Sequence, residues 1–592
     1  MSAETIPGRL FHQAKLRPQA PAYHVRSGGQ WTVTNYADYA DQTRSCGKAL
    51  MALGLDEGQT TCILGFNRPE WTVMDIATMA IGCAPAGIYT TCSPEEVAYI
   101  VGHTEAPVVL VENHSQLAKV QEEWANLPAL KYVVLMGGAE AVEDERVLTW
   151  EEFNAKGSEI EDSAFAARLE ALQQDALATF IYTSGTTGPP KGVMLSHRNL
   201  AWTAQQAIGI VAANSDDSSL SYLPLSHIAE QMFSIHVPLT AGGCIYFAES
   251  IERVPDNLRE VEPTLVFGVP RIWEKMYAKI IEAGKSTQGL KRKLATWAKG
   301  VATEANAIKN SGGEPSGFLA LKYKLAQRLV FSKVKPRIGL NRARVCVSGA
   351  APINAEILEF FASLDIIIHE VYGQSEDTGP TTFNRPGSTR FGSVGPKIDG
   401  VEVEIREDGE IVVRGPNVFM GYYKDEEATN EALVDGWLHS GDLGAFDADG
   451  YLTITGRKKD IIITAGGKNV APKNWEGEVK QHPVVGEAVM IGDKRKFLTG
   501  LISLDPEAAE DWAKEHGVAI ADLDSDERLR ASIQEQVDAV NSRYARVEQV
   551  KKFAILPRPL SIDDGELTPT LKVKRSKVSE HFAELIDSLY AD

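Results

Sequence analysis

Apolar runs alternate with amphipathic segments through the first half of the chain. Residues 60–67, 106–113 and 131–138 are rich in β-branched and other apolar side chains, which is typical of buried parallel strands. Between the first two runs, residues 69–82 and 94–104 have the mixed apolar and polar spacing of helices. Strands that alternate with helices in this way predict a doubly wound α/β sheet.

A second set of apolar runs follows the first. These runs predict a further group of strands and lie at residues 264–270, 343–352 and 366–374. Shorter, turn-rich strands are expected within residues 401–415 and 450–456, and they favour a small antiparallel or barrel-like unit. Beyond residue 456 the pattern becomes α+β and ends in an amphipathic helix at residues 578–590.

The length of 592 residues exceeds what one hydrophobic core usually serves. We therefore predict a large N-terminal domain over residues 1–456, a junction at residues 457–460 and a smaller C-terminal domain over residues 461–592. The predicted fold class is α/β. Stacked doubly wound sheets and a small barrel-like unit form the large domain, and the smaller domain is α+β.

Composition narrows the classes of protein that this chain fits. A net charge of −20 argues against general nucleic-acid binding. The N-terminal residues lack the apolar core of a signal peptide, and no run of about 18 apolar residues predicts a membrane span. Six cysteines are scattered without CxxC spacing, which predicts buried free thiols in a reducing compartment. We expect a cytoplasmic protein.

One segment has the opposite charge to the rest of the chain. Residues 284–337 contain twelve basic and two acidic side chains, a net charge of +10. The simpler interpretation is a solvated helical insertion. The alternative is a surface that meets anionic lipid, or the phosphates of a large cofactor.

The stretch YTSGTTGPPKGVMLSH, residues 182–197, combines glycines, hydroxyls, two prolines and a lysine. An apolar run at residues 177–184 precedes it and a helix capped by Ser196 follows, so we interpret it as a strand-to-helix loop. Backbone N–H groups, hydroxyls and an ammonium together suit phosphate oxygens. A plain Gly-rich turn is the alternative. A Walker A motif is disfavoured, because Pro190 stands where its second glycine is needed.

Three further motifs carry polar side chains suited to a nucleotide. Ser375 and Glu376 in VYGQSEDTG end an apolar run and offer a hydroxyl for phosphate and a carboxylate for magnesium. Asp442 in GWLHSGDLG is expected on a tight turn, where its carboxylate accepts hydrogen bonds from a ribose diol. Lys572 in LTPTLKVKR stands near the C-terminus. Taken singly, these residues could be a turn cap, a surface charge and a solvated lysine.

The ordered set of motifs resembles the adenylate-forming superfamily of acyl-CoA synthetases, firefly luciferases and peptide-synthetase adenylation domains. The resemblance covers roughly residues 10–580. It implies that a carboxylate attacks the α-phosphorus of ATP to form an acyl-adenylate, with Mg²⁺ as cofactor. A thiol, such as that of the co-substrate CoA, then displaces AMP. Catalysis of this kind depends mostly on charge neutralisation and in-line positioning.

The resemblance implies a role for individual positions. Thr183 and Glu376 match magnesium-binding positions. The phosphate loop corresponds to Ser184, Gly185, Thr186, Thr187, Gly188 and Lys191. The adenine, α-phosphate and ribose contacts correspond to Gly349, Ala350, Tyr372, Ser375, Asp442 and Arg457. Lys572 matches the catalytic lysine that bridges the carboxylate and the α-phosphate.

Two positions imply a domain movement between the half-reactions. Lys459 matches the hinge about which the C-terminal domain rotates, so that this domain is expected to be mobile. Gly466 matches a position in the pantetheine channel for CoA. His227 in LPLSHIAEQ is placed beside the substrate carboxylate, with a structural histidine as the alternative.

The choice of acid depends on weaker features. Trp273 in VPRIWEK matches a gate over the fatty-acid tunnel of long-chain acyl-CoA synthetases, with a core tryptophan as the alternative. The basic insertion and the TPTLKVKR ending also resemble the long-chain group. We therefore expect a long-chain fatty acid:CoA ligase whose partners are fatty acid, ATP, CoA and an anionic membrane surface, without nucleic acid.

Three alternatives remain open at this point. The chain could be a fatty acyl-AMP ligase that feeds a carrier protein, or a ligase for medium-chain or aryl acids. It could also be a catalytically silent protein that traps fatty acid at membranes, although the joint presence of Lys572, Glu376 and Asp442 argues against that. The chain-length preference and the oligomeric state are not encoded in these motifs.

Overall fold

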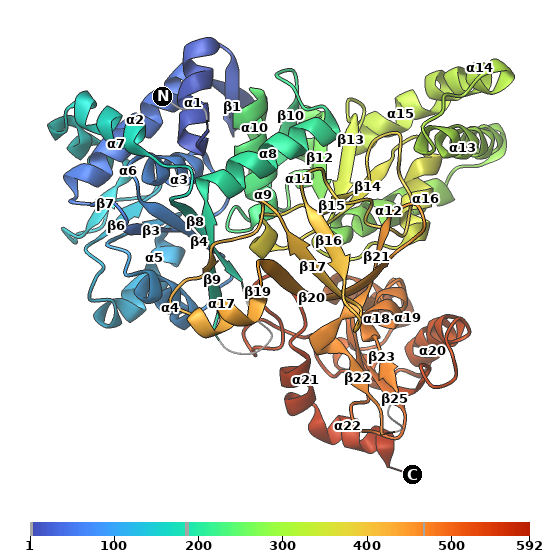
Figure 1. Cartoon of the computed structure of the whole chain (residues 1–592). Helices are drawn as coiled ribbons and strands as arrows, with labels where there is room; N and C mark the ends of the chain where they lie inside the picture. The colour runs from blue at the N-terminus through green and yellow to red at the C-terminus, as the bar shows by residue number, and fades with distance from the viewer. Residues whose placement is uncertain (1–3, 184–188, 466–467, 592) are drawn as a thin grey trace.

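An eight-stranded sheet forms the centre of the N-terminal part in the computed structural model, which describes residues 4–183, 189–465 and 468–591 (Figure 1). Its order is β18 (Gly421–Tyr422), β9 (Lys191–Ser196), β8 (Leu177–Thr183), β4 (Ala84–Ile88), β3 (Thr60–Leu64), β5 (Val108–Val111), β6 (Tyr132–Leu135) and β7 (Val147–Thr149). The strands from β8 to β7 are parallel. Helices α3 (Pro69–Ala80) and α4 (Pro94–Thr104) lie where the sequence predicts them.

The strand-to-helix interpretation of the Gly-rich stretch is wrong. β8 is followed by a second strand, β9, which pairs with it in antiparallel register, so residues 184–190 connect two strands. Helix α8 (His197–Val211) begins only afterwards, and Ser196 caps it as expected. The apolar run of Val193, Met194 and Leu195 is short, and the prolines before it conceal its strand character.

Two further sheets complete the layered part of the fold. One is parallel through β12 (Leu265–Gly268), β13 (Val345–Ser348) and β14 (Ile368–Tyr372), with β15 (Thr382–Phe383) antiparallel at its edge. The other has the order β10 (Ser218–Ser221), β11 (Cys244–Phe247), β1 (Pro21–Ser27) and β2 (Gln30–Asn35). The α/β class predicted from the sequence is confirmed.

A small antiparallel sheet follows, as the turn-rich pattern predicts. It comprises β16 (Glu402–Ile405), β17 (Glu410–Arg414), β19 (Leu433–Val434), β20 (Trp437–Phe446) and β21 (Leu452–Arg457). β20 pairs with both β17 and β21. This sheet lies between the large layered part and the C-terminal elements (Figure 1).

The C-terminal part has a sheet of its own. Its strands are β24 (Val485–Ile491), β25 (Leu498–Leu504) and β26 (Val550–Ile555). Helix α18 (Pro472–Val479) precedes the first strand, and α19 (Pro506–His516) and α20 (Glu527–Asn541) lie between β25 and β26 in the chain. Within the described residues, its hydrophobic clusters share no member with those of the N-terminal part. The domain division at residues 457–460 stays a prediction, which this separation supports.

The last predicted helix is wrong in one respect. Residues 578–590 do not form one helix, because α21 (Arg575–His581) ends before Phe582 and α22 (Ala583–Tyr590) begins after it. Phe582, Ile586 and Leu589 nevertheless pack into the C-terminal core. Their side chains explain the apolar periodicity that suggested a continuous helix.

The basic segment is helical. α12 (Pro270–Lys285) leads into α13 (Gly289–Asn310), which packs against α14 (Gly317–Ala326). Among the described residues, no helix has the length and the apolar stretch that a bilayer crossing needs. All six cysteines are free and five of them are buried, as expected.

We predict that Gly373→Ala lowers the midpoint of thermal unfolding. Gly373 begins the turn after β14, and a Cβ atom there would overlap the carbonyl oxygen of Gly379. Such overlap forces the backbone apart at a cost of about 1–3 kcal/mol. Gly300→Ala is the matched control, because its Cβ meets nothing within 4 Å on α13. Calorimetry that gave both variants the same midpoint would contradict this prediction.

Candidate active site

Asp442 joins two strands and a neighbouring sheet at the base of the candidate site. It pairs in register with Arg457, whose Nε donates to its Oδ1 at 3.0 Å. The hydroxyl of Tyr372 donates to the other carboxylate oxygen, also at 3.0 Å. Asp442 therefore lies within β20, and the tight turn expected from the sequence is wrong. A glycine with φ of 70° at Gly441 and a register shift after Leu443 bend the strand there.

Glu376 and Lys191 both contact Tyr422. The Tyr422 hydroxyl donates to Glu376 Oε1 at 2.8 Å, and Lys191 Nζ lies 4.8 Å from the centre of the Tyr422 ring. Lys191 also pairs in register with Thr183, the last residue of β8. The two ends of the predicted phosphate loop thus lie beside the predicted magnesium carboxylate. Ser184, Gly185, Thr186, Thr187 and Gly188 lie outside the described residues, as does Gly466.

The residues at this point fit a magnesium ion. Glu376 Oε2 makes no hydrogen bond or ion pair with another side chain in the described part of the chain, and the Thr183 hydroxyl is likewise unengaged there. Mg²⁺ takes oxygen ligands and usually relies on one or two carboxylates together with substrate phosphates and water. A preformed cluster of ligands is therefore not needed, and the described residues contain none.

A buried turn fixes Ser375 and Glu376. The Asp377 carboxylate accepts from the backbone N–H of Gln374 and from the Thr381 hydroxyl, both at 2.7 Å. The side chain of Asn417 donates to the carbonyl of Asp377 at 3.1 Å. Burial raises the pKa of Asp377 to about 8, and the nearby carboxylates act in the same direction. This turn holds Ser375 and Glu376 at the end of β14.

The predicted adenine contacts lie at the same sheet edge. Gly349 and Ala350 follow β13, and Tyr372 ends the neighbouring parallel strand β14. Carboxyl ends of parallel strands meet at one edge, where ligands of open α/β sheets usually bind. A Cβ on Gly349 would approach the Val371 side chain to 2.6 Å, and Ala350 has a φ of 67°. The chain turns sharply there.

His227 presents one nitrogen as a donor. It begins helix α9 (Ile228–Gln231), and its Nδ1 accepts the backbone N–H of Ala229 at 3.1 Å. Burial, together with the positive charge of Lys572, lowers the pKa of His227 to about 4. The ring is therefore neutral near pH 7, and its proton resides on Nε2.

Lys572 reaches this group of residues from the C-terminal part. Its backbone N–H donates to the Thr568 hydroxyl at 3.0 Å, and Thr91 of the N-terminal part donates to the carbonyl of Pro569 at 3.0 Å. The surrounding protein desolvates the ammonium, and Arg457 and Lys473 add repulsion, so the pKa of Lys572 falls to about 8. Asp442 and Glu376 oppose this shift, which places Lys572 within electrostatic reach of both carboxylates.

Other polar contacts hold the two parts of the chain together. Arg271 on α12 donates to Asp505, the N-cap residue of α19, at 2.5 Å. At the junction, Lys458 Nζ lies 2.6 Å from Asp408 of the small sheet. Asp460 lies 3.9 Å from Lys473 on α18. The exposed Lys459 therefore lies between Lys458, which contacts the N-terminal part, and Asp460, which contacts the C-terminal part. This position favours the predicted hinge, which stays a prediction.

Trp273 is fully buried at the start of α12. Its Nε1 donates to the carbonyl of Gly268 at 3.1 Å, and its ring meets Phe361 edge to face, 5.4 Å between centres. A core residue and a closed gate would both show these contacts. The gating role of Trp273 therefore stays a prediction.

Comparison with known families identifies the family of the chain. Residues 10–423 match the family described as AMP-binding enzyme, and residues 459–592 match the AMP-binding enzyme C-terminal domain. The chain belongs to the AMP-binding enzyme family. The recognition of an adenylate-forming protein from its motifs is confirmed.

Curated relatives of this AMP-binding enzyme extend over nearly its whole length. A Xenopus laevis protein named long-chain-fatty-acid–CoA ligase ACSBG2 is 40% identical over 96% of this chain and 81% of the relative. A Mycobacterium bovis protein named long-chain-fatty-acid–CoA ligase FadD15 is 36% identical over 99% of this chain and 97% of the relative.

Solved structures of similar fold are more distant in sequence. The adenylation domain of a carboxylate reductase from Mycobacterium chelonae has a TM-score of 0.75 at 20% identity, covering 99% of this chain and 91% of that one. ATP-bound MatB from Rhodopseudomonas palustris has a TM-score of 0.70 at 23% identity, covering 98% and 99%. These likenesses establish the fold of the AMP-binding enzyme.

Sequence reasoning missed several residues that this site uses. Tyr422 links Glu376 to Lys191, and Asp377 supports the turn that carries Glu376. Lys473 adds a cation beside Arg457 and Lys572. Asp377 follows Glu376 directly, so its motif offered a signal. Nothing in the local pattern marks Lys473, because its neighbours in the site are distant in sequence.

We predict that Asp442→Ala weakens AMP binding at least about tenfold, because a charged acceptor for the ribose hydroxyls is lost. The variant also leaves Arg457 without its partner. Isothermal calorimetry with AMP measures the effect. Asp399→Ala is the control, because that exposed carboxylate pairs with Arg385 in a similar way. Equal affinity of the two variants for AMP would exclude Asp442 from the nucleotide site.

Proposed function

We propose that this AMP-binding enzyme is a long-chain-fatty-acid–CoA ligase, which activates a fatty acid with ATP and transfers the acyl group to CoA. The names of its relatives support the acid and the acceptor. The observation that carries the chemistry is the position of Lys572, within electrostatic reach of Asp442 and Glu376 and near His227. A catalytically silent fatty-acid trap has no need of this arrangement.

The first half-reaction joins two anions. A fatty-acid carboxylate oxygen forms a bond to the α-phosphorus of ATP, and the bond to the pyrophosphate oxygen breaks. Lys572 neutralises the charge that builds up where both groups meet, and Nε2–H of His227 orients the carboxylate. Asp442 and Arg457 hold the ribose. Tyr372, Gly349 and Ala350 flank the adenine.

The phosphates have their own contacts. Ser375 donates to the α-phosphate, and Lys191 acts with the loop at residues 184–188 on the β- and γ-phosphates. Thr183 and Glu376 would hold Mg²⁺, which supplies a positive charge to the triphosphate when bound. The hydroxyl contact from Tyr422 keeps the Glu376 carboxylate aimed at this point.

The second half-reaction needs the C-terminal part to move. The CoA thiolate attacks the acyl carbon, the bond from that carbon to the AMP oxygen breaks, and AMP leaves. Rotation about Lys459 withdraws Lys572 and brings Gly466 to the pantetheine path. Residues on either side of Lys459 are tied to opposite parts, so one residue absorbs the change in backbone angles.

One assay tests the proposed function. AMP formation from ATP is followed with acids of graded chain length, in the presence and absence of CoA, and acyl-CoA is quantified. A long-chain ligase gives CoA-dependent turnover that rises with chain length. Turnover restricted to aryl or medium-chain acids would contradict the assignment. Acyl-adenylate that accumulates despite CoA would favour a carrier protein as the acceptor.

The proposed gate can be tested with the same acids. Trp273 fills the space between Gly268 and Phe361, and Phe360 extends this aromatic cluster. We predict that Trp273→Ala changes kcat/KM for long acids by at least about threefold more than for short acids, because only a long chain passes the gate. Phe360→Ala is the control. An identical ratio at every chain length would make Trp273 a core residue only.

We predict that Lys572→Ala nearly abolishes adenylation and spares acyl transfer from preformed acyl-AMP. Because only the ammonium form acts, kcat/KM for wild-type adenylation falls as the pH rises through about 8, the pKa of Lys572. Lys473→Gln removes a cation that lowers this pKa, so its profile should shift to higher pH. Pyrophosphate exchange measures adenylation alone. Equal loss in both half-reactions, or an unshifted profile, would remove Lys572 from this role.

A further inference from the structure

The basic segment forms a helical hairpin at the edge of the molecule. A hydrogen bond holds α13 against α16 (Ala355–Ser363): the side chain of Asn306 on α13 donates to the carbonyl of Ala362 on α16 at 2.8 Å. One face of α14 packs onto α13 through Tyr323 and Ala326. Figure 1 shows both helices at the upper right, whereas α21 and α22 lie at the bottom of the view. The outer face of α14 therefore points away from the protein core.

That outer face is apolar, although it is exposed. Phe318, Leu321 and Leu325 on α14 have 70%, 64% and 47% of their surface accessible, and Leu329 in the following turn has 37%. The spacing of three, four and four residues puts them on one side of the helix. We call these four residues the α14 face. Scattered exposed apolar side chains are ordinary, but a contiguous stripe marks a surface that another apolar phase covers.

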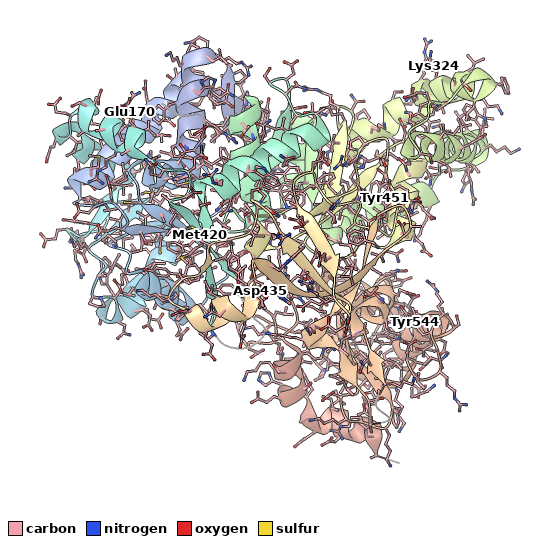
Figure 2. All side chains as sticks on the ribbon, in the orientation of Figure 1. Glu170, Lys324, Met420, Asp435, Tyr451 and Tyr544 are labelled. Carbon is pink, nitrogen blue, oxygen red and sulfur yellow. The ribbon has the colours of Figure 1, made fainter. Side chains whose placement is uncertain are left out.

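The helical segment that carries the α14 face is also rich in basic side chains. Four of the twelve basic residues in the segment contact residues outside the α14 face: Lys285 with Glu282, Lys299 with Phe360, Lys309 with Tyr323 and Lys335 with Asp365. A fifth, Lys322, lies 4.5 Å from the ring centre of Phe318, within the α14 face itself. In the described part of the chain Lys322 and the other seven form no ion pair. We call them the basic rim: Lys291, Arg292, Lys293, Lys322, Lys324, Arg328, Lys333 and Arg337. Figure 2 shows Lys324 at the outer margin of the molecule.

We propose that the α14 face and the basic rim form a docking surface for an anionic lipid bilayer. An amphipathic helix with leucine and phenylalanine on one side and lysines beside them lies in the interface of such a membrane. The charge argues in the same direction, because a chain of −20 is repelled by anionic surfaces except where its positive charge is concentrated. An acidic protein surface shares the charge but does not require four exposed apolar side chains.

In the sequence, the helices of the docking surface directly follow the helix that carries the proposed acyl gate. α12 carries Trp273 in its first turn and ends at Lys285, four residues before α13 begins at Gly289. A bilayer bound at α14 would hold partitioned fatty acid near this helix. This consequence rests on the proposed function, whereas the docking itself does not, so the experiment measures binding and not turnover.

Vesicle co-sedimentation tests the proposal directly. The full chain is mixed with vesicles of phosphatidylcholine alone, or of phosphatidylcholine with phosphatidylglycerol, at low and high salt. We expect binding to the anionic vesicles that weakens with salt. Phe318→Ser/Leu321→Ser/Leu325→Ser should bind at least about tenfold more weakly, and Lys291→Glu/Arg292→Glu/Lys293→Glu should lose the preference for anionic lipid.

A matched control uses exposed apolar residues elsewhere. Leu16, Ile520 and Val547 have 64%, 59% and 54% of their surface accessible, so Leu16→Ser/Ile520→Ser/Val547→Ser removes comparable apolar surface. This control should bind vesicles as the wild type does. Circular dichroism and thermal unfolding verify that each variant is folded. Equal binding by the α14 variant and the control would overturn the proposal.

A fluorescent label gives a second, local readout. Five of the six native cysteines are buried and Cys244 is partly so, which lets an environment-sensitive dye react selectively with an introduced surface thiol. A dye on Leu321→Cys should shift to the blue with anionic vesicles, whereas a dye on Ile520→Cys should not. Absence of wild-type binding to anionic vesicles would overturn the proposal. Retention on a polyglutamate resin in that case would assign the surface to an acidic protein partner.

Discussion

The position of Lys572 depends on a few polar contacts between two separately packed parts of the chain. Thr91 holds the carbonyl of Pro569, and Arg271 holds Asp505. The first contact is a single neutral hydrogen bond. The second is an ion pair partly open to water, where such pairs contribute little net free energy. Such contacts orient the C-terminal part without fixing it permanently. The role that we propose for Lys572, which neutralises one transition state and then withdraws, requires a joint of this kind.

The N-terminal part supplies the opposite property, which is rigidity. Asp442 is tied to Arg457 and Tyr372, and Glu376 to Tyr422, so each carboxylate is oriented before a ligand arrives. Buried Asp377 supports the turn beneath Glu376. Preorganised groups lose little free energy to reorganisation during the reaction. In the proposed mechanism, oriented carboxylates in the N-terminal part and a movable lysine in the C-terminal part therefore have separate roles.

The local patterns predicted much of this arrangement. Apolar runs and amphipathic spacing located β3, β5, β6, α3 and α4, because propensity and burial agree in those elements. Strand β9 was missed, since three apolar residues after two prolines do not distinguish a strand from a loop. The turn expected at Asp442 was wrong because the positive φ of Gly441 and the register shift after Leu443 bend the strand without ending it.

The site itself was only partly visible in the sequence. The order of the motifs predicted that Lys572, Asp442 and Glu376 belong to one site, although it predicted no contact between side chains. Pairwise contacts such as Arg271 with Asp505 were not predictable, because 234 residues separate them and Asp505 lies in none of the motifs. The exposure of the α14 face was also hidden. Leucines at helical spacing normally indicate a buried side, and only the packing of α14 on α13 shows which side is covered.

The central claim is that one site performs both half-reactions because Lys572 enters the site for adenylation and leaves it before acyl transfer. A cross-link between the N-terminal and C-terminal parts tests this claim. Arg271→Cys/Asp505→Cys is joined with a short bismaleimide, and the unlinked double variant and both single variants are controls. We expect the linked enzyme to retain acid-dependent pyrophosphate exchange and to lose acyl transfer to CoA. Acyl-CoA formation by the linked enzyme at the rate of the unlinked double variant would contradict the account.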